Sequence, residues 1–570
     1  MLYRSSTLVR SVASLALLGG LAACRSADEW ALDADRQVYE LLAERRAGIA
    51  TGEIEFTIQP PEDTLRQAVL AGAVGVEAPL EIDLVDCLVI GAENSRIYRN
   101  EREDLYLAAL DLTLERWRYS YQEFGSLSGV LAGSGVEGES AESASFGFGL
   151  GFVKLFGIGA QVVADVGIDL ARVLVTGDPW EAISSASFSI TQPLLRGFGP
   201  KITLEPLTQA ERNLVYAVRE YERFRRAYAV DVANRYFRIL SARDTLGNEQ
   251  RNLERLEELR ENSASLAEAG RRSEIEVDQA RQDVLRANDR VIQAQQSFAA
   301  ALDDFKLFLG VPISTEIDLA TESGLLFAPD DPILNLSEEF AVAVALSERL
   351  DFQTTLDRLV DAERRSRVIA DALRAGLDLS VDALAVSDPD ELLDFDSDAA
   401  PWNLRLDLDL PINLIPERNA YRRALVTRQA SERAVEEASD QIRLRLRDLR
   451  RELDSAAASL AIQEGAVQLA ERRVEGADLS LQAGRSSTRD LLEAREDLVE
   501  AQNQRVRLAV DLTLAGLEYL LAIERLRILP AGIEVEREGL IAVRPDAALP
   551  TDPSESENAE FEDAEAEEQA

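Results

Sequence analysis

The feature that most constrains this chain is a long helical pattern that occurs twice, 214 residues apart. The segment Ala269-Gly270-Arg271 returns as Ala483-Gly484-Arg485. After the first copy, apolar residues from Val277 to Phe308 keep an unbroken three-and-four spacing, which is typical of a coiled coil. After the second copy the same seam is interrupted only by Arg505. The sequence therefore predicts two long helical hairpins, over 208–310 and 419–526, each turning at its Ala-Gly pair.

Each helical pattern is preceded by an alternating strand and a proline. In the segment 187–200, Phe188 and Ile190 alternate with polar residues. Pro193 cannot donate a hydrogen bond to a strand ladder, and two glycines and a second proline follow it. A similar change occurs at Leu410-Pro411, after four leucines that alternate with polar side chains. We interpret Pro193 and Pro411 as joints between a strand and a long helix.

The alternating strands are of the length and pattern that cross a membrane as a β-barrel, with lipid on one face and water on the other. The polar face of a soluble sheet is the alternative interpretation. Three aromatic residues, Tyr119, Tyr121 and Trp402, fit either a barrel girdle or ordinary packing. The residues expected to line a water-filled lumen are Asp378, Asp382, Arg405, Asp407 and Asp409.

The expected number of strands requires an oligomer. Two strands in each repeat give four per chain, fewer than the roughly eight strands of the smallest closed barrels. An open sheet edge is not stable in lipid, so several copies must close the barrel together, and three copies would supply twelve strands. A further alternating hairpin at 145–170 has no counterpart in the second repeat, and its placement stays open.

Composition excludes several classes of function. The formal net charge of −42 makes nucleic acid an unsuitable partner. The chain has no histidine and only two cysteines, so no metal site, cofactor or enzymatic activity is predicted. Cys87 lies in an apolar helical pattern, where a small buried residue is expected.

The N-terminus has the pattern of an export signal. Arg4 and Arg10 precede a short apolar run over 12–23. This run ends in Leu21-Ala22-Ala23-Cys24, which resembles the lipobox of bacterial lipoproteins and implies removal of residues 1–23 and lipid attachment at Cys24. An ordinary cleaved signal with an incidental cysteine is the alternative. Either interpretation takes the protein out of the cytoplasm.

Across residues 84–526 the sequence resembles the TolC-like outer-membrane efflux and secretion channels. The matching features are Gln192-Pro193-Leu194-Leu195-Arg196-Gly197, Leu309-Gly310-Val311-Pro312 and the paired Ala-Gly turns. The resemblance implies a homotrimer with a twelve-stranded outer-membrane barrel and a twelve-helix periplasmic tunnel. It also implies a periplasmic adaptor protein and an inner-membrane transporter as partners.

The same resemblance places the turns at Gly270 and Gly484 near the periplasmic end of the tunnel. It implies that acidic residues after the second turn, Asp490 and Glu493, narrow the closed opening as a carboxylate ring. Glu276 holds the position in the first repeat that corresponds to Asp490. Solvated charges at exposed helix ends are the alternative interpretation.

We therefore expect a mainly α-helical protein with transmembrane β-strands and an internal repeat. The predicted function is a passive exit duct of a tripartite efflux or type I secretion system, anchored by lipid in the outer membrane with a large periplasmic portion. The alternative is a lipid-anchored periplasmic coiled-coil scaffold without a pore. The predicted divisions are a signal peptide (1–23), a periplasmic lead-in (24–82), the first repeat (83–310), a connector (311–337), the second repeat (338–527) and an acidic, disordered tail (528–570).

Overall fold

The computed structural model describes most of the chain between residues 25 and 535, and within that part no helix is long and apolar enough to cross a membrane. The predictions for residues 1–23, Cys24, Gly484 and the tail beyond 535 fall outside the described residues. The chain forms two compact units, one from Met1–Ile49, Glu103–Arg219 and Thr354–Val435, the other from Ala50–Arg102, Glu220–Gln353 and Glu436–Ala570. The described residues are 25–46, 56–59, 64–72, 79–133, 142–173, 180–271, 273–320, 336–388, 395, 401–483, 485–529 and 532–535.

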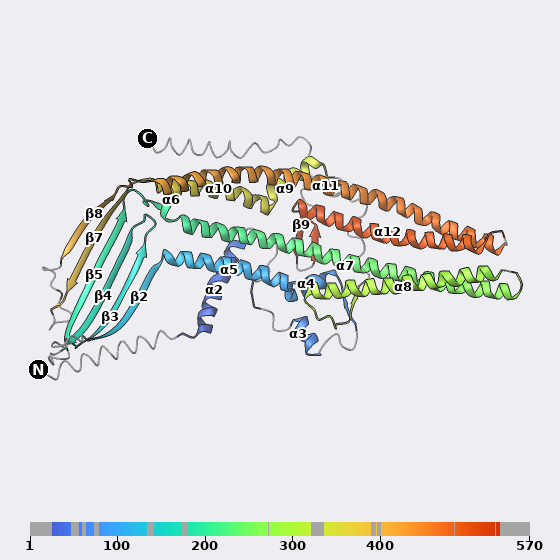
Figure 1. The fold of residues 1–570 in the computed structure, drawn as a ribbon, viewed down its shortest axis with the longest axis horizontal. Helices are drawn as coiled ribbons and strands as arrows, with labels where there is room; N and C mark the ends of the chain where they lie inside the picture. The colour runs from blue at the N-terminus through green and yellow to red at the C-terminus, as the bar shows by residue number, and fades with distance from the viewer. Residues whose placement is uncertain are drawn as a thin grey trace. The chain divides into compact units, whose positions relative to one another are not determined.

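The first unit contains a six-stranded antiparallel sheet in the order β2-β3-β4-β5-β7-β8 (Figure 1). The expectation of four strands per chain was wrong. The predicted hairpin at 145–170 is present as β3 and β4, and it is inserted into the sheet between the strands that precede and follow it. The strands are β2 (Tyr121–Gly133), β3 (Glu142–Leu155), β4 (Gln161–Val173), β5 (Glu181–Pro193), β7 (Gly376–Val386) and β8 (Trp402–Asp409).

A helix in the lead-in is a feature that the sequence analysis did not predict. Helix α2 (Ala27–Arg46) packs on α5 (Arg96–Arg118) within the first unit. The hydroxyl of Tyr106 donates to Asp35 Oδ1 over 2.7 Å, and the rings of Tyr39 and Tyr106 lie 6.1 Å apart. Val38 and Leu42 are fully buried. The same unit contains α6 (Pro200–Thr203), most of α10 (Leu350–Asp371) and the first parts of the long helices α7 and α11.

The second unit is mainly helical and includes two short β-pairs. Strand β1 pairs in parallel with β6, and β9 pairs with β10. Because β10 covers residues 532–535, ordered structure continues beyond the predicted start of the tail. The elements are α3 (Leu65–Leu70), β1 (Leu80–Ile82), α4 (Leu84–Asn94), α8 (Glu274–Leu309), β6 (Ile317–Leu319), α9 (Glu338–Glu348), α12 (Thr488–Ala522), β9 (Leu526–Leu529) and β10 (Gly532–Val535).

The two predicted helical hairpins are confirmed. Helices α7 (Glu205–Glu268) and α8 form the first, and α11 (Ile415–Gln482) and α12 form the second. Helices α7 and α11 end 214 residues apart. Gly270 has φ +67°, and the Arg271 N–H donates to Leu266 O over 2.8 Å, which is a Schellman-type helix end. The corresponding Arg485 N–H donates to Ser480 O over the same distance.

The first hairpin ends at a glycine that the fold requires. Gly310 follows α8 with φ +80°, and a Cβ placed there would lie 2.2 Å from Asn94 O. The Val311 N–H donates back to Lys306 O over 2.9 Å. The Leu-Gly-Val-Pro segment therefore ends the helix and allows the backbone of α4 to approach closely.

Candidate functional site

One face of the six-stranded sheet is mainly apolar, and we call it the apolar face. Its charged members include Glu123, Lys154 and Arg172, which lie near the ends of their strands. The register sets Leu127 of β2 opposite Phe148 of β3 and Phe148 opposite Ile168 of β4. Further along the sheet, Val381 of β7 lies opposite Leu404 of β8. In the single chain Leu127 is 74% exposed and Leu404 is 62% exposed, while Phe148, Ile168 and Val381 are half-buried. The other members of the face include Phe146, Leu150, Phe152, Val162, Val166, Leu170, Phe188, Ile190, Leu379, Leu406 and Leu408.

The opposite, polar face contains all five predicted lumen residues. Asp378 lies directly opposite Asp407, and Ser380 lies opposite Arg405. Like charges in directly opposed positions repel each other, so this pair is stable only where water or cations reach it. The same face gains Asp165 and Asp169 from β4, together with Gln161, Ser185, Ser187, Ser189, Thr191, Asp382, Asn403 and Asp409.

Cross-strand hydrogen bonds link the polar face. The hydroxyl of Ser189 donates to Asp382 Oδ1 over 2.8 Å, and the hydroxyl of Ser187 donates to Asp165. Asp165 and Asp382 come from strands on opposite sides of β5, so the serines of β5 join the inserted hairpin to the strands of the second repeat. The polar face is therefore hydrogen-bonded across the insertion.

The sheet has two open edges. Among the described residues, β2 and β8 each pair on one side only. The six strands alternate in direction, so β8 runs antiparallel to β2. The β8 edge of one copy therefore has the direction needed to continue the sheet onto the β2 edge of another.

The two strand-helix joints are tied to each other. Arg196 Nη2 donates to Asp409 Oδ2 over 2.9 Å, which places this predicted lumen residue in an ion pair with the first joint. The Gly197 N–H donates to Asp371 Oδ2 at the end of α10. Strand β5 ends at Pro193 as predicted, and one further backbone hydrogen bond follows it, from the Leu194 N–H to Leu377 O over 2.7 Å. Pro411 lies between the end of β8 and the start of α11.

Two of the three predicted girdle aromatics lie on the apolar face of the sheet, and the third packs outside it. Tyr121 begins β2 on the apolar face, 5.8 Å from the Phe152 ring and 4.8 Å from Lys154 Nζ. Trp402 begins β8 on the same face and is 73% exposed. Tyr119 instead donates its hydroxyl proton to Thr203 O over 2.6 Å, which explains it by packing.

All three predicted aperture carboxylates have local partners near the helix starts. Asp490 accepts from the Ser487 N–H over 2.8 Å, and the Ser487 side chain caps the Asp490 N–H in return. Glu493 accepts from Arg489 Nε over 2.9 Å. Glu276 Oε2 accepts from the Thr488 hydroxyl over 3.1 Å, which links the starts of α8 and α12. The hydrogen bonds from Ser487 hold the pKa of Asp490 below its ordinary value.

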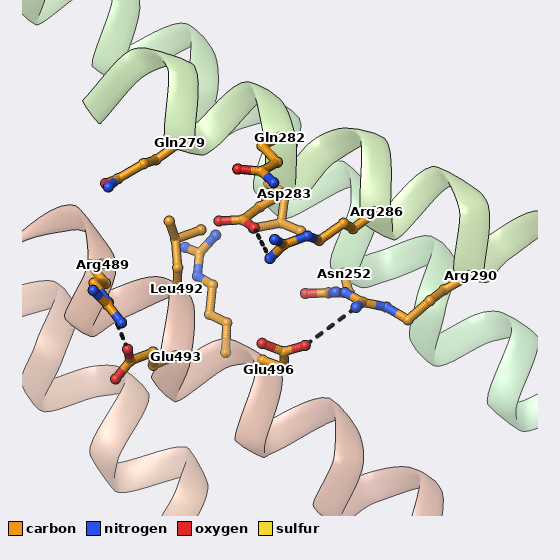
Figure 2. Close-up of a pocket in the computed structure, with 12 residues that line it drawn as sticks. Asn252, Gln279, Gln282, Asp283, Arg286, Arg290, Arg489, Leu492, Glu493 and Glu496 are labelled. Carbon is orange, nitrogen blue, oxygen red and sulfur yellow. Dashed lines mark hydrogen bonds and ion pairs between the residues drawn. The ribbon is translucent and has the colours of Figure 1, made fainter. Parts of the chain in front are cut away.

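A polar cavity of about 310 Å³ lies near these helix starts, between α7, α8 and α12 (Figure 2). Arg290 of α8 bridges two carboxylates at its edge, Glu249 of α7 and Glu496 of α12, each at 3.3 Å. Asn503 Nδ2 donates to Glu249 over 3.0 Å and Asn503 accepts from Asn248 over 2.8 Å, and all three side chains are buried. This chain of contacts joins the two helical hairpins within the second unit.

Comparisons with known proteins identify the fold. The model of the outer membrane efflux protein family matches residues 177–311, which include β5, α7 and α8. The structure resembles the CmeC outer membrane channel of Campylobacter jejuni, with TM-score 0.58 and 14% identity over 80% of this chain and 87% of that one. The resemblance predicted from the sequence is confirmed.

Further solved structures have the same fold. The outer membrane protein VceC of Vibrio cholerae matches with TM-score 0.57 and 15% identity, over 77% of this chain and 95% of that one. The open state of the MtrE outer membrane channel of Neisseria gonorrhoeae matches with TM-score 0.57 and 14% identity, over 77% and 88%. No curated protein sequence matches the chain.

The sequence contains a signal for the structural role of Asp490 and Glu276 that was not used in predicting them as aperture residues. Ser273 and Ser487 each precede an acidic residue by three positions, which is the spacing of a helix-capping box. Ser273 caps Glu276 as Ser487 caps Asp490. The Arg290 bridge had no such signal, since its partners lie 41 and 206 residues away.

Proposed function

We propose that this protein is the outer-membrane exit duct of a tripartite efflux or type I secretion system. Several copies, three by the family resemblance, close the sheet into a barrel. The long helical hairpins continue from the barrel as a periplasmic tunnel that receives substrates from an adaptor protein and an inner-membrane transporter. The duct is passive and catalyses no reaction.

The single observation that carries this proposal is the two-faced sheet with its open edges. A mainly apolar face on one side and carboxylates on the other match a wall between lipid and water. Unpaired strand edges cannot remain in the hydrocarbon of a bilayer, so neighbouring copies must pair them. A coiled-coil scaffold without a pore needs no such sheet.

The acidic helix starts support a cation-attracting opening at the tunnel end. In a symmetric oligomer, Asp490 and Glu493 repeat around the axis and form a carboxylate ring, which attracts cations and repels anions. Both side chains are exposed in the single chain. Their local partners, Ser487 and Arg489, lie on the same segment and move with them.

The lipid anchor on Cys24 completes the proposal. Helix α2 begins at Ala27, three residues after the proposed acylation site, and the contacts of Asp35 and Tyr39 with Tyr106 tie it to α5 in the first unit. Two or more acyl chains hold a protein firmly on a bilayer, whereas one binds marginally. Metabolic labelling with a palmitate analogue tests this step, with Cys24→Ala as the control.

Planar-bilayer recording of the purified full chain tests the duct. Oligomers that resist unfolding in detergent and give discrete single-channel currents are expected. Stable oligomers that lie in the outer-membrane fraction but never conduct would favour the scaffold. Crosslinking in intact envelopes, followed by identification of the captured adaptor and transporter, tests the partners.

A further inference from the structure

The inserted hairpin β3–β4 changes the size of the barrel that this chain can build. The hairpin pairs with β2 on one side, from Tyr121↔Lys154 to Gly133↔Glu142. On the other side it pairs with β5, from Gln161↔Thr191 to Ala171↔Glu181. The hairpin is therefore part of the sheet itself, and it adds two full strands to the four that the two repeats supply.

The turn of the hairpin is anchored in the first strand-helix joint. Ile158 O accepts from the Gly199 N–H over 3.2 Å and from Gln192 Nε2 over 3.3 Å. Gly159 has φ +94°, and a Cβ there would lie 2.8 Å from both Gly197 O and Pro193 Cγ. A turn fitted this closely to the joint marks the hairpin as a built element of the sheet.

The two faces of the hairpin continue the two faces of the sheet. Its apolar face carries large side chains such as Phe148 and Val166. On the polar face Gly149 lies opposite Gly167, and the charged residues are Asp165 and Asp169. Because most of these inward side chains are small, the hairpin lengthens the wall without filling the space that it encloses.

We propose that the protein forms an eighteen-stranded barrel, three copies of a six-stranded sheet, with a lumen wide enough for large neutral or cationic solutes. This inference rests on the trimer of the proposed function. Barrel diameter grows roughly linearly with strand number, so the barrel is about 1.5-fold wider than a twelve-stranded one, and barrels of this size leave an aqueous channel. Asp165 and Asp169 add two carboxylates per copy to the inner wall, which favours cations.

Removal of the hairpin provides a matched comparison. Deleting residues 142–173 leaves β2 and β5 antiparallel, with the end of β2 and the start of β5 at the same side of the sheet. The shortened chain can therefore form a four-stranded sheet. A reporter cysteine, Ser380→Cys on the polar face of β7, is placed in both chains. Maleimide-coupled polyethylene glycols of increasing mass are then added to intact cells, and the largest polymer that reacts is recorded.

We expect the full chain to form a complex of three copies by native mass spectrometry. We also expect the radius of the largest reactive polymer to fall by about one third after the deletion, in proportion to strand number. Equal cut-offs in both chains, or a complex of two copies and therefore twelve strands, overturn the proposal. Cys87 is buried, and the chain without the reporter controls for its labelling.

If the shortened chain does not assemble, a second measurement tests whether the β3–β4 hairpin is part of the barrel wall. Val163→Cys and Val166→Cys place one cysteine on each face of β4. In a wall strand a water-soluble maleimide labels position 163 at least tenfold faster than position 166. Equal labelling means that the hairpin lies outside the wall and overturns the wide barrel. Absence of both currents and labelling at Ser380→Cys would instead refute the duct itself.

Discussion

The sheet of the first unit and the helix ends of the second differ in how far a single chain completes them. Near the ends of the helical hairpins, Leu256, Ala287 and Leu491 are buried together in a core cluster. On the apolar face of the sheet, Leu127 and Leu406 remain 74% and 62% exposed. The hairpins thus bring their own core, whereas within one chain much of the apolar face and, among the described residues, the outer edges of β2 and β8 stay uncovered.

The polar side chains of the two regions also differ in how far they find partners within one chain. Around Arg290 the charged and amide side chains pair with residues of the same chain, and the buried network of Asn248, Asn503 and Glu249 fixes how the hairpins align. On the polar face of the sheet, Asp378 and Asp407 face each other as like charges. We infer that the helix ends are built for one defined packing and the polar face of the sheet for contact with water.

The largest expected effect comes from a charge placed on the apolar face. Leu406→Arg lies in the middle of β8, and an arginine facing the bilayer midplane costs about 2–4 kcal/mol per copy. Assembly into detergent-resistant oligomers in lipid vesicles should fall sharply. The matched control is Leu384→Arg on the polar face of β7, which should assemble normally. Equal loss in both variants would show that the two faces do not separate lipid from water.

A smaller effect is expected where the helical unit depends on a glycine. Gly310→Ala forces a left-handed backbone on a residue with a side chain and brings its Cβ against Asn94 O, at a cost of about 2–4 kcal/mol. Chemical unfolding monitored by circular dichroism measures it. Gly270→Ala is the control, since it has a similar φ but open space around it, and should cost about 1–2 kcal/mol. If the two variants lose similar free energies of unfolding, the close contact with Asn94 does not contribute to the cost of Gly310→Ala.

Sequence reasoning predicted these helical hairpins well because their signals are local. The seam from Val277 onward and the turn at Gly270 lie within one stretch of chain. Even so, α2 was missed, because its polar composition hides the few residues, such as Val38 and Leu42, that are buried. The capping serines were readable from their spacing alone.

The strand count could not be predicted in the same way. The alternation in β3 and β4 revealed a hairpin, but strand pairing joins residues far apart in the chain, and no local pattern states which neighbour a strand takes. The placement of the β3–β4 hairpin depends on such distant contacts, for example the hydrogen bonds that Ile158 O accepts from Gly199 and Gln192 of the first strand-helix joint. The Arg290 bridge was hidden for the same reason.

A third prediction concerns the bridge between the helical hairpins. Arg290→Ala removes the contacts to Glu249 and Glu496. Because Arg290 is about one third exposed, Glu496 is exposed and the buried Glu249 keeps its hydrogen bond from Asn503, the loss is about 1 kcal/mol. We expect a higher open probability in single-channel recordings. Arg286→Ala is the matched control, because Arg286 pairs with Asp283 of its own helix at 3.2 Å. Equal opening in both variants would remove any special role for the bridge.

The smallest effect on stability is expected for changes at Asp490. These changes test whether its carboxylate belongs to a charge ring or only caps the helix. Removing both carboxylates by Asp490→Ala with Glu493→Ala should abolish block of the channel by divalent cations. Asp490→Asn keeps an acceptor for the Ser487 N–H while removing the charge, and Ser487→Ala weakens the cap by about 1 kcal/mol while keeping the charge. If the carboxylates form a charge ring, block by divalent cations should be weaker in Asp490→Asn and normal in Ser487→Ala. The reverse result would assign Asp490 to capping alone.

The pH dependence of the block follows from the direction of the Asp490 shift. The hydrogen bonds from Ser487 lower the pKa of Asp490, so its contribution to stability is complete above the ordinary value of 3.8 and is lost only as the pH falls through the lowered value. The carboxylate therefore stays charged throughout mildly acidic conditions. Its share of the block, measured as the difference between the chain and Asp490→Asn, should stay constant between about pH 7 and pH 5. A difference that declines over this range would show that the pKa of Asp490 lies above its ordinary value in the assembled channel, as repulsion between the neighbouring carboxylates of a ring would cause.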